Sequence, residues 1–286
     1  MFPAALLLGC SLISRQHGPD FSPEKTWASL ATNIREIQAH NAANLSFEEN
    51  HRFAYNMVLY KHGDMLYRGV MKLVNENLEQ LAKDDLFPAF PSGASSDPME
   101  KSQEGEMLLK ALKRTWDDHT GNMQKLGQVL KYMVRTCNLL ISLFMTFSKA
   151  ILLKDRVYTK SAEVPETWEA GLKAFLQNII RSPIKDHVIT AVLNQIEVER
   201  DGYVINRSAV KGCVDVLLSL QTDGGATVYK HLLEPAVLKE SQSYYEREGR
   251  RAVEECDAPG FLKKVRCLAC LASSPLLIFC IGGGAL

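Results

Sequence analysis

The spacing of apolar residues constrains this sequence more than any other feature. They recur every three or four positions in one segment after another between Ser22 and Val265, which places them along one face of an α-helix. No two neighbouring segments alternate apolar and polar residues around a hairpin turn, as a β-sheet would require. The sequence therefore predicts an all-α protein whose helices each bury one face, as in stacked helical repeats.

Local signals predict where several helices begin and where the chain loops. Ser22 precedes a proline and an acid, and Ser46 precedes two acids, so both serines are predicted N-caps. Asn206 is a third predicted N-cap. The stretch 86–105 is rich in Pro, Ser, Gly and Asp and is predicted to be a flexible loop, followed by a helix that starts near Met107.

Composition and motif content argue against several classes of function. The chain has 33 basic and 33 acidic residues and a formal net charge of zero, so no overall field favours nucleic acid or an acidic membrane. The sequence lacks the motifs of dinucleotide-binding, nucleotide-binding, zinc-protease and serine-hydrolase sites. We therefore expect no catalytic residues, no cofactor and no metal, and we expect neither nucleic acid nor a membrane as a partner.

Two groups of reactive side chains are better explained by structural roles. Asp117, Asp118 and His119 could form an acid–base cluster, but on a helix the two carboxylates would point mainly outward. Cys267 and Cys270 have the spacing of one zinc knuckle, whereas a structural zinc site usually needs two. The seven cysteines are irregularly spaced and do not resemble a secreted disulfide framework, which favours a reducing compartment.

One predicted helix has more apolar surface than a single core contact requires. Its first stripe recurs every four residues and consists of Phe47, His51, Tyr55 and Leu59. A different stripe, able to face the core, consists of Ala54, Met57 and Val58. Such a helix either lies centrally in the fold or presents one face to a partner. Periodicity alone leaves both alternatives open and favours burial.

A series of short motifs follows in order along the chain. The first is LSFEE at Leu45–Glu49, continued to Gly63. The later ones are Trp116 with Asp118 and His119, Tyr132–Met133, Asp155–Tyr158, Ile184–His187, and Glu199–Arg200 with Gly202, Arg207 and Cys213. Together they resemble the cullin family, and in particular cullins of the type that binds BTB-domain adaptors (the cullin three type). The similarity runs from about Thr26 to Val265, apart from two stretches.

The resemblance implies an elongated, right-handed stalk of stacked helical cullin repeats. The first repeat would span 22–180 and include the predicted loop 86–105. Part of a second repeat would span 181–265, and the segment 1–21 has no assigned role.

The resemblance also implies a scaffold function in a cullin-RING ubiquitin ligase, which acts in ubiquitin-dependent protein degradation in the cytoplasm and nucleus. A BTB-domain adaptor would bind the first repeat, and a RING-box protein would bind a distant C-terminal region that this sequence does not contain. Catalysis would then be by proximity, with no nucleophile from the cullin. The adaptor-facing residues would be Leu45, Ser46, Phe47, Glu48, His51, Tyr55 and Tyr158. We expect Phe47 and Tyr55 to dominate binding, whereas His51 departs from the tyrosine common in the family.

Two stretches depart from the family pattern. Val134–Lys154 separates Met133 from Asp155, which the resemblance makes neighbours, and an apolar tail at 266–286 replaces the family sequence. The first begins with a Val-Arg pair, whose codons can contain a splice donor, and the same pair stands at the start of the tail. We interpret both as intron-derived parts of a truncated family member. The alternative is a different helical-repeat tethering protein, anchored in a membrane by its C-terminal tail.

Overall fold

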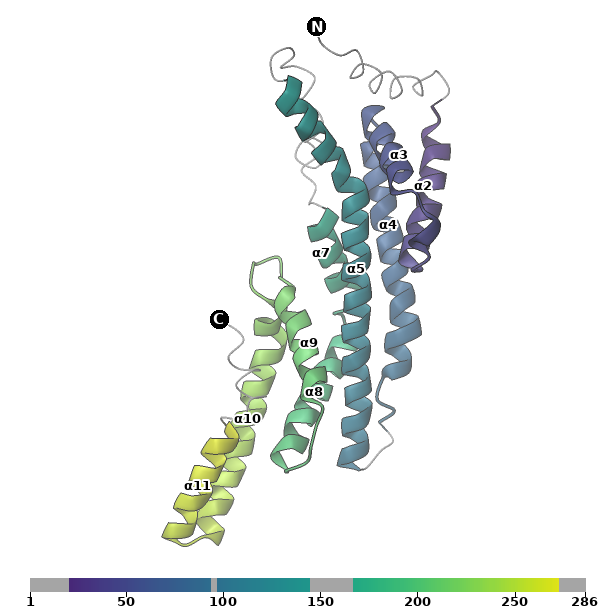
Figure 1. Ribbon diagram of the computed structural model, residues 1–286. Coiled ribbons are helices and arrows are strands. Elements are labelled where there is room, and N and C mark those ends of the chain that lie inside the picture. Colours follow the sequence, from purple (N-terminus) through teal and green to yellow (C-terminus); the bar gives the residue numbers. More distant parts are fainter. Residues whose placement is uncertain (1–20, 94–96, 145–166, 273–286) are drawn as a thin grey trace. The chain divides into compact units, whose positions relative to one another are not determined.

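The computed structural model describes residues 21–93, 97–144 and 167–272, and α-helices make up most of these ranges (Figure 1). Within them β-structure is limited to one isolated bridge, between Gln221 and Thr227. The prediction of an all-α fold is confirmed. None of the described helices is both long enough and apolar enough to cross a bilayer.

The chain forms two compact units. Unit 1 comprises Met1–Val74 and Asn122–Ala170, and unit 2 comprises Asn75–Gly121 and Gly171–Leu286. The chain therefore passes from one unit to the other three times. Each passage falls within a helix: α4 (Gly63–Leu81), α5 (Pro98–Phe144) and α7 (Thr167–Asn178).

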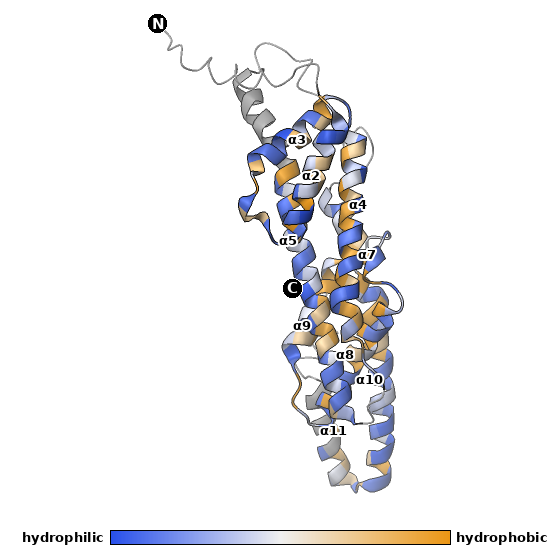
Figure 2. Cartoon of the chain, turned by 90° about the vertical axis from the view of Figure 1, so that its right-hand side faces the viewer, coloured by the Kyte–Doolittle hydropathy of each residue, from blue (hydrophilic) through white to orange (hydrophobic). Residues whose placement is uncertain are grey.

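Unit 1 begins with α2 (Pro23–Gln38) and α3 (Phe47–Leu59), which a short 3-10 turn at Ala42–Asn44 separates. The predicted N-caps are confirmed for both helices, because Ser22 Oγ accepts from the Lys25 amide and Ser46 Oγ accepts from the Glu49 amide. Each of α2, α3 and α4 carries both hydrophobic and hydrophilic residues (Figure 2), as expected of helices that bury one face.

The core of unit 1 lies along α2, where Leu30, Ile34 and Ile37 are each 1% exposed. Helix α4 passes so close to α2 that a Cβ added at Gly69 would overlap the Trp27 ring. Only a glycine allows this approach without a shift of the indole.

Unit 2 contains α8 (Ile184–Arg200), α9 (Arg207–Ser219), α10 (Val228–Glu255) and α11 (Ala258–Ala272), together with parts of the three helices that enter from unit 1. Asn206 Oδ1 accepts from the Ala209 amide, which confirms the predicted N-cap of α9. Gly202, two residues after the end of α8, has a φ of +88°. The amides of Gly202 and Tyr203 donate to the carbonyls of Glu199 and Val198 in the last helical turn.

The predicted loop at 86–105 is wrong in its second half. A π-helical turn at Ala82–Leu86 and a 3-10 turn at Phe87–Ala89 follow α4, and α5 then begins at Pro98 rather than near Met107. Asp97 explains the early start, because its Oδ1 accepts from the Met99 amide at 3.0 Å, and a proline suits the first helical turn. The cap was missed because a stretch rich in Pro, Ser, Gly and Asp normally indicates a loop.

Helix α5 continues without a break to Phe144. The first part of Val134–Lys154 is therefore helical, and its remainder lies outside the described residues. Tyr158 and most of the apolar tail, from 273 onward, also lie outside them. The predicted division into repeats at 180/181 stays a prediction.

Candidate functional site

Helix α3 has one face buried within unit 1 and another exposed to solvent. On the inner face, Ala54 and Met57 are fully buried and Asn50 is 1% exposed. On the outer face, Phe47 is 38% exposed and Leu59 is 45% exposed. The helix is therefore seated by a small apolar face while large apolar side chains remain at the surface.

The four residues spaced by four form one surface stripe, which we call the α3 stripe: Phe47, His51, Tyr55 and Leu59. Its two ends are exposed, and His51 and Tyr55 between them are half-buried. Burial of this stripe in the core, which periodicity alone favoured, is therefore wrong. The alternative, in which the helix presents this face outward, agrees with the structure.

The other predicted site residues lie at the beginning of the same helix. Leu45 is half-buried, and Ser46 and Glu48 are exposed. Six of the seven predicted residues are thus gathered between Leu45 and Tyr55, whereas the structure does not describe Tyr158. Glu49 and Arg52, also on α3, form a 3.7 Å ion pair, and their side chains are each 50% exposed. An exposed ion pair of this kind contributes little stability.

Two hydrogen bonds fix α3 against its neighbours, and the sequence predicted neither. Asn33 Nδ2 on α2 donates to Asn50 Oδ1 at 2.6 Å, and His51 Nδ1 bonds to the main-chain carbonyl of Val129 on α5. Because a carbonyl can only accept, His51 Nδ1 must bear the hydrogen. The partners lie 17 and 78 positions away along the chain, beyond the reach of any local pattern.

The acid–base candidate in unit 2 is divided between surface and core. His119 is 2% exposed, and its Nε2 lies 2.9 Å from the Gly171 carbonyl. Burial lowers the pKa of His119 to about 4, because the charged imidazolium loses its hydration. Asp117 is exposed and pairs with Lys113 instead. The structural explanation of this cluster agrees with these contacts.

The cysteines give no metal centre in the part of the chain that the structure describes. Cys213 is buried and Cys256 is half-buried. No group of three or more His, Cys, Asp or Glu side chains in the described residues could hold a metal ion. The side chains of Cys267 and Cys270 lie outside that set.

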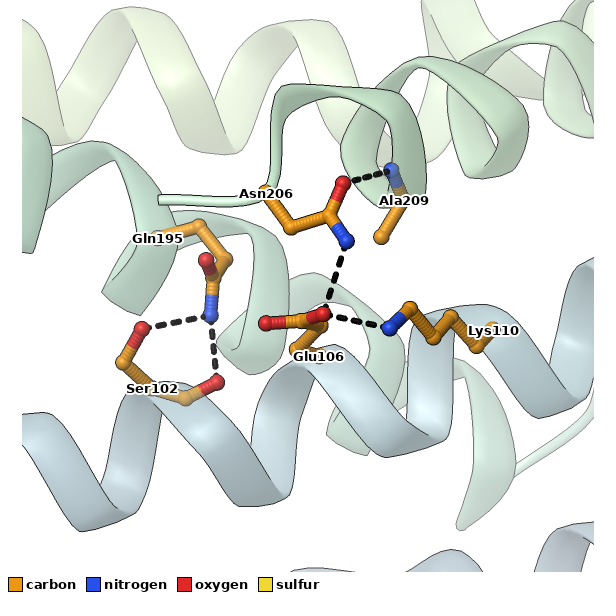
Figure 3. A network of polar contacts seen from close by, with 6 residues as sticks. All are labelled: Ser102, Glu106, Lys110, Gln195, Asn206 and Ala209. Carbon is orange, nitrogen blue, oxygen red and sulfur yellow. Dashed lines mark hydrogen bonds and ion pairs between the residues drawn. The ribbon is translucent and has the colours of Figure 1, made fainter. Parts of the chain in front are cut away.

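A polar network joins α5 to α8 and α9 within unit 2 (Figure 3). Gln195 Nε2 donates to the Ser102 carbonyl at 2.6 Å and to its hydroxyl at 2.9 Å. Asn206 Nδ2 donates to Glu106 Oε1 at 2.7 Å, and Lys110 pairs with the same oxygen at 2.6 Å. Asn206 and Lys110 share Glu106 Oε1, and Asn206 also caps α9, which gives the network a structural role. The buried Gln195 Oε1 has no hydrogen-bond partner among the described residues.

Comparison with known proteins covers nearly all of the described helices. The cullin alpha solenoid domain matches residues 27–269. Cullin-3 of Dictyostelium discoideum is 32% identical over 248 residues, which are 86% of this chain and 27% of that protein. Cullin-3B of Arabidopsis thaliana is 31% identical over 84% of this chain and 28% of its own length. Human Cullin-4A is 26% identical over 86% of this chain. The chain spans little more than a quarter of these relatives, 27–28% of their length.

Proposed function

Because this chain belongs to the cullin family, we propose that it is a non-catalytic scaffold component of a cullin-RING ubiquitin ligase and that it docks a BTB-domain adaptor. The similarity to proteins named Cullin-3 from an amoeba and a plant supports the choice of adaptor class. The proposed setting is ubiquitin-dependent protein degradation in the cytoplasm and nucleus.

The observation that carries the proposal is the outward α3 stripe. An exposed phenylalanine and an exposed leucine on a helix that is held in the fold by the buried Asn50, Ala54 and Met57 can anchor it in a groove on a partner. Aromatic side chains lose little conformational entropy and bury a large area on binding, so they often dominate interface energy. We assign Phe47 and Tyr55 as the main anchors.

The remaining docking residues would surround these anchors. Leu45 supplies apolar area at the start of the helix, and Ser46 and Glu48 supply a polar rim that is exposed to solvent. His51 lies between the two anchors, and Tyr158 stays a proposed contribution from the later segment. Together these are the seven residues that the family resemblance indicates.

The proposed scaffold works by proximity. The adaptor, with its bound substrate, would occupy α3, and a RING-box protein would bind the part of the longer relatives that this chain does not match. Holding the two partners on one protein raises the effective concentration of the charged ubiquitin carrier at the substrate. The cullin needs no nucleophile or base for this role.

The test is a binding titration of the chain against a panel of purified BTB-domain proteins. We expect micromolar or tighter binding by at least one, about −8 kcal/mol. Phe47→Ala should weaken that binding about thirtyfold, because a hot-spot aromatic contributes about 2 kcal/mol or more. The measurement is isothermal titration calorimetry with the wild-type chain and the variant side by side.

A matched control is Phe87→Ala. Phe87 is 42% exposed, close to the 38% of Phe47, but it lies in unit 2. It should leave adaptor affinity unchanged, since it removes the same side chain from a different surface. Equal losses for the two variants, or no binding to any BTB-domain protein by the folded wild-type chain, would refute the docking assignment.

A further inference from the structure

Two consecutive residues of α3 hold the helix from two sides. Asn50 accepts a hydrogen bond from Asn33 on α2, and His51 donates one to the Val129 carbonyl on α5. Both contacts lie within unit 1. They are placed near the middle of the α3 stripe, between Phe47 and Tyr55.

These two bonds can set the rotation of α3 about its axis. The apolar seat of the helix is small, since Ala54 and Met57 are its fully buried apolar residues, and apolar contacts tolerate small rotations. Hydrogen bonds are directional and weaken steeply when their geometry is lost. Bonds to α2 on one side and to α5 on the other therefore keep the stripe facing outward.

We propose that His51 is a positioning residue of the docking site. It acts through α5 and orients Phe47 and Tyr55, rather than recognising the adaptor through its own ring. The inference rests on the proposed function and adds to it the residue that preorganises the surface. Preorganisation of this kind improves affinity because less conformational entropy is lost on binding.

Loss of the His51 bond should change affinity more than stability. The Val129 carbonyl lies inside the continuous helix α5, where the amide four residues later also bonds to it. Removing the imidazole donor therefore leaves the Val129 carbonyl with a hydrogen-bond partner, and a buried acceptor without any partner is the costly outcome of losing a hydrogen bond. Loss of the bond should therefore allow α3 to rotate more about its axis, without unfolding unit 1.

Three substitutions separate positioning from direct contact. His51→Asn places an amide nitrogen where Nδ1 stands, so it keeps the donor without the ring. His51→Gln places its nitrogen one bond farther, near the position of Nε2, and His51→Phe keeps a ring without a donor. We expect His51→Asn to bind a BTB-domain protein within about twofold of wild type, and the other two to bind about tenfold more weakly.

A second readout requires no adaptor. Nitrogen-15 NMR of the wild-type chain should show the hydrogen of His51 on Nδ1. Hydrogen exchange of the α3 amides should be equally slow in wild type and His51→Asn, and at least severalfold faster in His51→Phe.

The outcomes distinguish this inference from the proposed function. Adaptor binding that is weakened in His51→Asn but kept in His51→Phe would overturn positioning and make the ring a direct contact. A hydrogen found on Nε2 alone would also overturn it. If the wild-type chain binds no adaptor, the proposed function fails, and the NMR and exchange measurements still decide whether His51 orients α3.

Discussion

His119 is a residue whose chemistry is decided by its surroundings. The sequence places it beside two carboxylates, but the fold buries its imidazole against Phe175, with ring centroids 5.4 Å apart, and gives it the Gly171 carbonyl as acceptor. The bond requires a hydrogen on Nε2, which the neutral ring supplies. The low pKa of His119, about 4, follows from burial.

This low pKa predicts an acid-sensitive contribution to stability. The pKa of His119 is about 4 in the folded chain and about 6.5 in an unfolded one. The unfolded state therefore takes up the proton first as the pH falls. The contribution of the neutral imidazole is complete above about pH 6.5 and is lost progressively toward pH 4, by up to about 3 kcal/mol.

The measurement is urea unfolding of wild type and His119→Gln at pH 7 and pH 4.5. Glutamine can donate to the same carbonyl but does not titrate, so the free energy of unfolding should fall less for the variant. His231→Gln, at an exposed histidine, is the matched control variant. The same fall in His119→Gln as in wild type would rule out this residue as the cause.

At this scale the sequence predicted local contacts and missed distant ones. The N-caps at Ser22, Ser46 and Asn206 were predictable because each acceptor and its donor amide lie three residues apart. The exposure of Phe47 could be anticipated only from the family resemblance. The bond from His51 to α5 depends on how unit 1 packs, and no spacing rule contains that information.

Among the helices, α9 is attached to α5 through one amide. Asn206 caps α9 with its Oδ1, 3.3 Å from the Ala209 amide, and donates its Nδ2 to Glu106. The pKa of Glu106 is lowered, with its hydrogen bond to Lys110 as the main cause. A single side chain therefore caps the beginning of α9 and links this helix to α5.

Asn206→Asp should separate these two roles. Aspartate keeps a capping oxygen but loses the donor and places a second carboxylate beside Glu106. We expect a loss of roughly 1–2 kcal/mol in the free energy of unfolding at pH 7. In the folded variant the pair holds a proton more tightly than in the unfolded chain, so this loss should shrink as the pH falls through about 4.

Asn206→Ser is the matched variant, because it keeps a cap without adding charge. Chemical unfolding of the three proteins at pH 7 and pH 4 gives the comparison. If Asn206→Asp were as stable as Asn206→Ser at pH 7, the added carboxylate beside Glu106 would cost no stability, contrary to the prediction.

Periodicity predicted the helices better than their ends. The apolar spacing of α2, α3 and α9 was sufficient, since each buries one face. The start of α5 at Pro98 was missed because a Pro-, Ser- and Gly-rich composition normally indicates a loop. In the turn between α3 and α4, Lys61 has a positive φ, +65°, which its residue type does not predict.

For the molecule as a whole, the family and the all-α class were predictable from ordered motifs and helical spacing. The two compact units were not. The boundaries between them fall inside α4, α5 and α7. The apolar spacing within a helix does not show which part of the helix packs in which unit.

Shared helices predict that the two units unfold together. Trp27 reports on unit 1 and Trp116 on unit 2. Two variants with one tryptophan each, Trp116→Phe/Trp168→Phe and Trp27→Phe/Trp168→Phe, should each give a fluorescence transition that coincides with its own circular dichroism transition. A fluorescence midpoint that departs from the circular dichroism midpoint in either variant would show that the units unfold separately.

The three passages between units also affect how the chain can fold while it is being made. The ribosome releases a protein from its N-terminus. Residues 75–121 of unit 2 are therefore synthesised before Asn122–Ala170, which complete unit 1. Unit 1 cannot be completed before part of unit 2 has been synthesised. Helix α3 can pack on α2 early, but His51 lacks its acceptor, the Val129 carbonyl, until the second half of α5 has left the ribosome.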